Sequence, residues 1–274
     1  MSAISTVAAP KLHPRNTGFE WRSVSRSLTR LTAAQRDQYN EHGYVLVKDV
    51  FRAEEIAAVQ AAIDPFEAAF ETRLREEFGG KTFIAKADAI TFTTHLVLQS
   101  EIARQFSAHP VFREICQDLL TSTPRLYWDQ AVYKKPGNPE EFPWHQDNGY
   151  TFTEPQQYLT CWVPLSQATE ANGCPWVVPG LHRQGTLNHE LKPLGLTCLE
   201  EPKGAVCVPG EVGDVIVFSS LTPHRTGPNL TPDVRKAYIL QYAPDGAVVH
   251  GHDGITRTAD DPQRQYLLSD VALD

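Results

Sequence analysis

Two residues near the middle of the chain could share a metal ion. His145 and Asp147 stand two positions apart within residues 144–148. On an extended strand, side chains at i and i+2 point to the same side, so the two could converge on one ion. A His-x-Asp pair also arises by chance, and a histidine and an aspartate on the solvated end of a strand are the simpler interpretation of this pair alone.

A third candidate ligand, His224, follows an apolar strand-like run that ends at Ser219. Two imidazoles and one carboxylate on one side of a metal form the facial triad of non-haem Fe(II) oxygenases, which leaves positions open for substrates. The same ligands with a bound water describe the catalytic zinc of a hydrolase. The three residues alone leave both metal chemistries open.

Arg235 is a candidate anion-binding residue that opens the strand after His224. On that strand it shares a face with Ala237, Ile239 and Gln241. An arginine among small and apolar neighbours needs a buried anion to offset its desolvation, and a carboxylate can bind the guanidinium fork bidentately. A zinc hydrolase has no standing need for such a residue, so Arg235 favours an enzyme that binds a small acid.

Turn-forming residues divide the chain into a helical front and a β-rich region. Before residue 124 there are four prolines and four glycines, whereas residues 124–245 hold fifteen prolines and ten glycines. Frequent breakers between short apolar runs, such as those at 126–133, 158–165 and 234–242, are typical of a sandwich or barrel. We expect a mainly β protein with flanking helices, in the α+β class.

Residues 31–123 form the predicted helical front. Thr32 and Gln35 fit a capping box, and Gly43 fits a helix end. Apolar residues recur every three or four positions over 56–78 and 102–119, which predicts amphipathic helices packed on the core. We expect residues 1–27 to be a poorly ordered arm and residues 28–274 to be one domain, with a β core at 124–245 and a C-terminal tail at 246–274.

Composition excludes several classes of function. The 274 residues are 41% hydrophobic and 21% charged, as in globular proteins, and a net charge of −8 gives no reason to expect nucleic acid or a membrane as partner. No apolar run approaches the roughly 18 residues of a membrane span, and no secretory leader is recognised. Five cysteines without a C-x-x-C pair indicate reduced thiols. We expect a cytoplasmic protein that acts on a small molecule, and the oligomeric state stays open.

Seen together and in order, the motifs resemble the phytanoyl-CoA dioxygenase family. The resemblance spans about residues 31–242 and rests on Leu31-Thr32, Gly43-Tyr44-Val45, Asp129-Gln130, Lys135-Pro136-Gly137, Trp144-His145-Gln146-Asp147, Asn172-Gly173-Cys174, Val178-Pro179-Gly180, His182-Arg183, Gly213-Asp214, His224, Gly227-Pro228-Asn229 and Arg235. Members of this family are Fe(II)- and 2-oxoglutarate-dependent oxygenases. The resemblance implies a double-stranded β-helix, that is, a cupin-like jelly roll, with a helical N-terminal region.

The resemblance also implies roles for individual residues. The iron ligands would be His145, Asp147 and His224. Arg235 would bind the distal carboxylate of 2-oxoglutarate, assisted by the hydroxyl of Thr226. Further positions on the cosubstrate side would be Thr160, Trp162 and Gln130.

The implied reaction is hydroxylation of an aliphatic C–H bond of an unidentified small molecule. It consumes dioxygen and converts 2-oxoglutarate to succinate and carbon dioxide. Asp147 favours hydroxylation over halogenation, because halogenating members of the family have a small residue in place of the carboxylate ligand. A zinc hydrolase using the same ligands and a non-catalytic jelly-roll binding protein are the alternatives.

Overall fold

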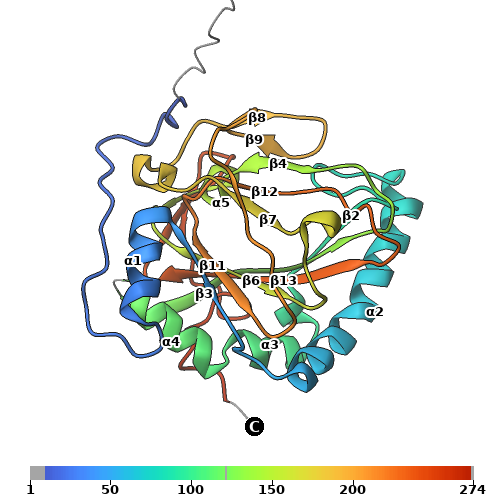
Figure 1. Ribbon diagram of the computed structural model, residues 1–274, viewed down its shortest axis with the longest axis horizontal. Coiled ribbons are helices and arrows are strands. Elements are labelled where there is room, and N and C mark those ends of the chain that lie inside the picture. The colour runs from blue at the N-terminus through green and yellow to red at the C-terminus, as the bar shows by residue number, and fades with distance from the viewer. Residues whose placement is uncertain (1–9, 121, 273–274) are drawn as a thin grey trace, which may run out of the picture.

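The structure, a computed structural model, describes residues 10–120 and 122–272. Within these residues two antiparallel sheets face each other (Figure 1). The larger sheet has the order β1(Tyr44–Val47), β11(Val215–Ser219), β6(Leu159–Pro164), β13(Arg235–Pro244), β3(Pro124–Lys134) and β2(Ile90–Thr94). The smaller sheet has the order β10(Val206–Cys207), β7(Pro175–Val177), β12(His224–Thr226) and β4(Phe142–His145). This confirms the expected mainly β architecture with flanking helices.

Shorter elements surround the two sheets. One small sheet joins β15(Thr256–Thr258), β14(Val248–His250) and β5(Phe152–Glu154), and another joins β8(Glu190–Leu191) and β9(Leu196–Thr197). The helices are α1(Ala33–His42), α2(Ala53–Phe78), α3(Glu101–Ser107), α4(Pro110–Leu119) and the single turn α5(Asp147–Tyr150), with 3-10 turns η1(Leu96–Leu98), η2(Glu170–Asn172) and η3(Leu181–Gln184). Figure 1 shows α1 to α4 along the outer side of the larger sheet.

Strand alternation separates two apolar clusters on the two faces of the larger sheet. On β11, Val215 and Val217 pack with residues of the helices, whereas Ile216 and Phe218 face the space between the sheets. On β13 the helix side holds Tyr238, Leu240 and Tyr242. The opposite side of β13 carries Arg235, Ala237, Ile239 and Gln241, which therefore line the interior of the sandwich, as the spacing predicts.

Local signals place the first helix as the sequence predicts. The Thr32 hydroxyl accepts from the Gln35 backbone N–H, and the Gln35 side chain accepts from the Thr32 N–H, which completes the capping box. Gly43 ends α1 in the left-handed conformation with φ 82°. The chain then enters β1 directly, so the end of α1 fixes the start of the larger sheet.

The N-terminal arm differs from the sequence-based expectation. Residues 1–9 lie outside the described residues, but residues 10–27 lie against the body of the protein. Leu12 forms an antiparallel bridge with Leu187, and the buried Asn16 amide donates to the carbonyls of Gln184 and Thr186 at 2.8 and 2.9 Å. These contacts are one isolated backbone bridge and one side-chain amide, neither of which leaves a periodic pattern in the sequence.

The structure also bears on whether the chain could cross a membrane. In the described part of the chain, no helix combines the length and the apolar composition that crossing a bilayer requires.

We predict that Gly43→Ala destabilises the protein more than Gly79→Ala. Both glycines have positive φ, 82° and 62°, so each alanine incurs left-handed strain of about 1 kcal/mol. A Cβ at Gly43 would also lie 2.5 Å from His182 Nδ1 and Thr222 Oγ1, whereas one at Gly79 meets nothing within 4 Å. Overpacking of this kind adds roughly 1–3 kcal/mol. Urea unfolding measures the difference, and equal losses for the two variants would contradict the packing argument.

Candidate metal centre

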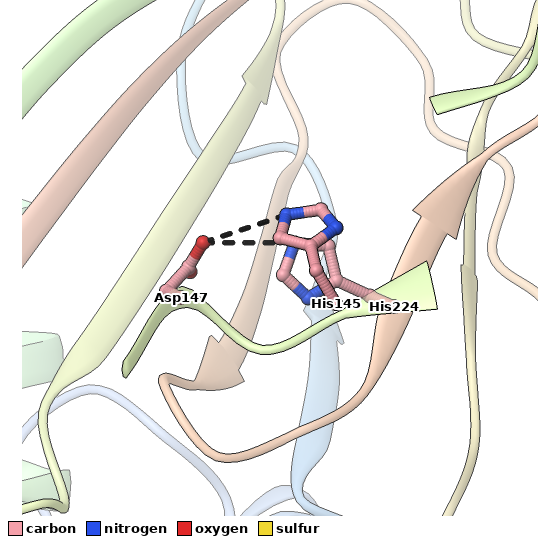
Figure 2. A group of neighbouring side chains, drawn as sticks. All are labelled: His145, Asp147 and His224. Atoms are coloured by element: carbon pink, nitrogen blue, oxygen red, sulfur yellow. Dashed lines mark ion pairs between the residues drawn. The ribbon is translucent and has the colours of Figure 1, made fainter. Parts of the chain in front are cut away.

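Strand pairing brings two imidazoles together. His145 ends β4 and His224 begins β12, and the two residues are directly opposite each other in the antiparallel pair, with ring centroids 4.1 Å apart. Asp147 Oδ1 lies 3.8 Å from the Nε2 atom of each histidine. Figure 2 shows the carboxylate facing both rings. Each of the three residues offers one possible ligand atom, and these three atoms lie within 4.8 Å of one another.

The position of Asp147 differs in detail from the strand geometry that the sequence predicts. β4 ends at His145, and Asp147 is the first residue of α5. The turn after the strand, and not the i, i+2 alternation, therefore directs the carboxylate toward the rings. His189 supports this turn, because its Nε2 accepts from the backbone N–H of Gln146 at 2.9 Å.

Hydrogen bonds orient both imidazoles for metal binding. His145 Nδ1 lies 2.8 Å from the carbonyl of Pro143, and His224 Nδ1 lies 3.0 Å from the carbonyl of Thr222. A proton on Nδ1 that is donated to the carbonyl leaves the Nε2 lone pair free on the side of Asp147. Burial lowers the pKa of His145 to about 3 and that of His224 to about 4, so both rings are neutral near pH 7.

The carboxylate of Asp147 is held from its other oxygen. The Thr160 hydroxyl on β6 donates a hydrogen bond to Asp147 Oδ2, and Oδ1 faces the histidines. Burial raises the pKa of Asp147, and nearby His145 opposes that shift. Two neutral imidazoles and one oriented carboxylate oxygen form a donor set that fits a divalent ion such as Fe(II) or Zn(II).

Arg235 is fully buried and only partly hydrogen bonded. Its Nη1 donates to the carbonyl of Val132 at 3.3 Å, and its guanidinium carbon lies 5.3 Å from the centre of the Trp162 ring. Nε and Nη2 have no partner within the described residues. Burial lowers the pKa of Arg235 to about 10, so the side chain stays charged near pH 7. Two unpartnered donors on a buried cation fit the carboxylate of a small acid.

A cavity of about 380 Å³ connects the candidate ligands with the surroundings of Arg235. Its walls include the candidate ligands and four other residues selected from the sequence, namely Gln130, Thr160, Trp162 and Thr226. Arg235 is not one of the wall residues, but it contacts two of them, Val132 and Trp162. Thr160 lines the cavity, and its hydroxyl also contacts Asp147.

Several residues of the site were not predicted from the sequence. Lys134, opposite Arg235 on β3, is buried, and its Nζ donates to the carbonyls of Thr226 and Gly227. Strand pairing alone could have indicated Lys134, once β3 and β13 were aligned. His189 lies between β-strands in a loop that no pattern predicts. His182, from the His182-Arg183 motif, is buried against Trp21, with ring centroids 4.3 Å apart, and is not among the residues that line the cavity.

Comparison with known proteins gives consistent matches. The family described as Phytanoyl-CoA dioxygenase (PhyH) matches residues 39–237. A phytanoyl-CoA dioxygenase of Arabidopsis thaliana is 22% identical over 87% of this chain and 98% of its own length. A methylphosphonate hydroxylase of Gimesia maris is 25% identical over 78% of this chain and 81% of its own.

The fold is also found among solved structures. EctD from S. alaskensis, solved with 2-oxoglutarate and 5-hydroxyectoine, has a TM-score of 0.65 and 23% identity, covering 86% of this chain and 82% of that one. This likeness confirms the expected double-stranded β-helix.

We predict that Thr160→Val weakens binding of a divalent ion, because Asp147 loses the hydrogen bond that orients it. Loss of a residue that orients a metal ligand typically costs about 10–100-fold in metal affinity. Titration with Co(II), followed by its visible absorbance, measures the change. Thr93→Val is the matched control, since Thr93 is buried on β2 and its hydroxyl has no partner within the described residues. Equal affinity for the two variants would contradict the role of Thr160.

Proposed function

The chain belongs to the phytanoyl-CoA dioxygenase family of Fe(II)- and 2-oxoglutarate-dependent oxygenases, and from this premise we propose that it hydroxylates an aliphatic C–H bond of a small molecule. The proposal assigns Fe(II) to His145, Asp147 and His224. One observation carries it: this donor set shares a cavity with residues that contact a buried arginine lacking partners for two of its donors.

The three proposed ligands fit iron because they occupy one side only. Their donor atoms converge within 4.8 Å, and the cavity continues beyond them toward aromatic walls. Positions on the open side are available for 2-oxoglutarate and dioxygen. When bound, Fe(II) and 2-oxoglutarate supply the oxidation: dioxygen is reduced, 2-oxoglutarate is decarboxylated to succinate, and one oxygen atom enters the substrate C–H bond.

Arg235 supplies recognition of the cosubstrate in this proposal. Its fork would bind the distal carboxylate of 2-oxoglutarate, and the Thr226 hydroxyl lines the same cavity. Lys134 on β3 supports this end of the cavity, because its Nζ donates to the carbonyls of Thr226 and Gly227 at the end of β12. The aromatic ring of Trp162 closes the space next to the guanidinium and keeps water from competing for it.

The alternatives explain less of the site. A zinc hydrolase would use the same three ligands but has no use for the buried guanidinium. A non-catalytic binding protein would have no need for three oriented donor groups. Gln130, which the family resemblance assigns to the cosubstrate side, lines the cavity midway between Val132 and Trp128 on β3, and its Oε1 accepts from Trp128 Nε1 at 3.2 Å.

We predict that His145→Ala and Asp147→Ala abolish succinate release, because each removes one of three metal ligands. The enzyme is loaded with Fe(II) and 2-oxoglutarate without oxygen, and succinate is measured after oxygen is admitted in the presence of a panel of candidate substrates. His42→Ala, at the end of α1, is the control and should retain wild-type release. Circular dichroism verifies that each variant is folded. Full turnover by a folded ligand variant would refute the metal assignment, and hydrolysis supported by Zn(II) alone would replace the oxygenase.

A second prediction concerns the cosubstrate. Arg235→Lys should lower the affinity for 2-oxoglutarate about 10–100-fold, since it removes a forked, charge-assisted contact worth roughly 1.5–3 kcal/mol. The visible absorbance of the anaerobic Fe(II) complex reports 2-oxoglutarate binding without turnover.

The matched control is Arg225→Lys on neighbouring β12. Arg225 pairs with Glu141, and its guanidinium lies over the Trp144 and Trp176 rings, at 5.4 and 5.2 Å from their centres. This variant should bind 2-oxoglutarate as the wild type does. If the two variants bind it equally well, Arg235 is not the anchor.

A further inference from the structure

The cavity has an end made of aromatic side chains, which we call the aromatic end. It consists of Phe83, Tyr127, Trp128, Tyr150, Tyr158 and His252. The Tyr127 and Tyr158 rings meet edge to face at 5.2 Å, Phe83 meets Tyr150 at 6.1 Å, and Tyr150 meets the proposed ligand His145 at 5.3 Å. The aromatic end therefore adjoins the metal centre.

The Trp128 side of the aromatic end lies away from the cosubstrate anchor. On β3, Val132 contacts Arg235, whereas Trp128 is paired with Gln241 at the other end of β13. Four residues of strand separate Val132 from Trp128, which corresponds to about 13 Å. The proposed metal ligands are thus flanked by a cationic end that suits 2-oxoglutarate and by an aromatic end that is left for the substrate.

The cavity walls offer a charged substrate no counter-ion. Among the described residues, no lysine, arginine or glutamate lines the cavity, and the only aspartate is Asp147. Burial raises the pKa of Tyr150 and Tyr158, so both phenols stay neutral. His252 is engaged with the Tyr150 carbonyl through Nε2 at 2.7 Å.

Charges also balance when the site is filled as proposed. Asp147 and the two carboxylates of 2-oxoglutarate bring three negative charges, and Fe(II) and Arg235 bring three positive charges. Burial and nearby Arg235 lower the pKa of Lys134 well below its usual range, and its Nζ is taken up by the Thr226 and Gly227 carbonyls. The metal, its proposed ligand carboxylate, the cosubstrate and its anchor therefore balance one another in charge. A carboxylate, phosphate or ammonium group at the aromatic end would lose its hydration without gaining a partner, which is strongly unfavourable.

We infer that the substrate of this protein is an uncharged, largely apolar small molecule that packs against the aromatic end. The inference rests on the proposed function, since it takes the cationic end to be filled by 2-oxoglutarate. A volume of about 380 Å³, shared with the cosubstrate, confines the buried part of the substrate to a compact group. Neutral polar side chains on the wall, such as Gln241 and Thr151, can hydrogen bond a hydroxyl or carbonyl group but cannot balance a charge.

A matched set of probes tests this inference. The probes 4-phenylbutan-1-ol, 4-phenylbutanoate and 4-phenylbutylammonium share one skeleton and differ in charge. Each is titrated by calorimetry into the anaerobic Fe(II)–2-oxoglutarate complex, where no turnover occurs. We expect the alcohol to bind at least about tenfold more tightly than either ion, a difference of roughly 1.4 kcal/mol. The inference is overturned if either ion binds as tightly as the alcohol, or if the alcohol does not bind.

A positive charge introduced at the exposed edge of the cavity tests why the cavity would prefer uncharged probes. Phe83 is 49% exposed, so substitution there spares the core. Phe83→Arg should raise the affinity for 4-phenylbutanoate about tenfold over the matched variant Phe83→Leu, without strengthening binding of the ammonium probe. Unchanged affinity for 4-phenylbutanoate would show that the missing counter-ion is not what excludes anions.

The absorbance of the Fe(II)–2-oxoglutarate complex separates failure of this inference from failure of the proposed function. If the complex does not form, the proposed function fails whatever the probes do. If the complex forms and the charged probes bind as well as the alcohol, only the substrate class is wrong.

Discussion

The antiparallel pairing of β12 with β4 sets His145 opposite His224, and the candidate metal centre depends on this register. A slip of one residue would turn either imidazole to the other face of the sheet and away from Asp147. β12 is held from several sides: it also pairs with β7, and the Thr222 hydroxyl, just before it, donates to the Gly43 carbonyl at 2.7 Å. The end of α1 thus contributes to the placement of His224, although it lies far from it in sequence.

The interior of the sandwich combines apolar packing with a few buried polar groups. Arg235 and Gln241 stand on the same face of β13 as Ala237 and Ile239, and the opposite face packs against the helices. A fully apolar interior would be more stable, because each of these groups loses hydration on burial. Among the buried polar groups are Thr160, which orients Asp147, and Arg235, which places a positive charge near one end of the cavity. Burying them lowers the stability of the fold but provides the groups that bind the metal and the cosubstrate.

Much of this arrangement could be predicted from the sequence, because short-range patterns encode it. The capping box at Thr32, the end of α1 at Gly43 and the inward face of β13 follow from spacing alone. The family resemblance supplied the cosubstrate positions, which periodicity does not indicate. Contacts set by tertiary packing could not be predicted from the sequence. The hydroxyl of Thr160 bonds Asp147, and Asp147 stands in a helical turn whose direction depends on that packing.

The described part of the N-terminal arm, residues 10–27, belongs to the scaffold of the centre even though none of these residues lines the cavity. Asn16 holds the Thr186 carbonyl, the Thr186 hydroxyl accepts from Asn148, and the Leu187 N–H donates to the Gln146 side chain. These contacts run from the arm to both neighbours of Asp147. A chain shortened to begin at residue 39, where the family match starts, would keep every proposed ligand yet loosen the segment that presents the carboxylate. Removing the arm would therefore weaken iron binding although the arm does not contact the metal centre, because the turn that carries Asp147 would lose part of its support.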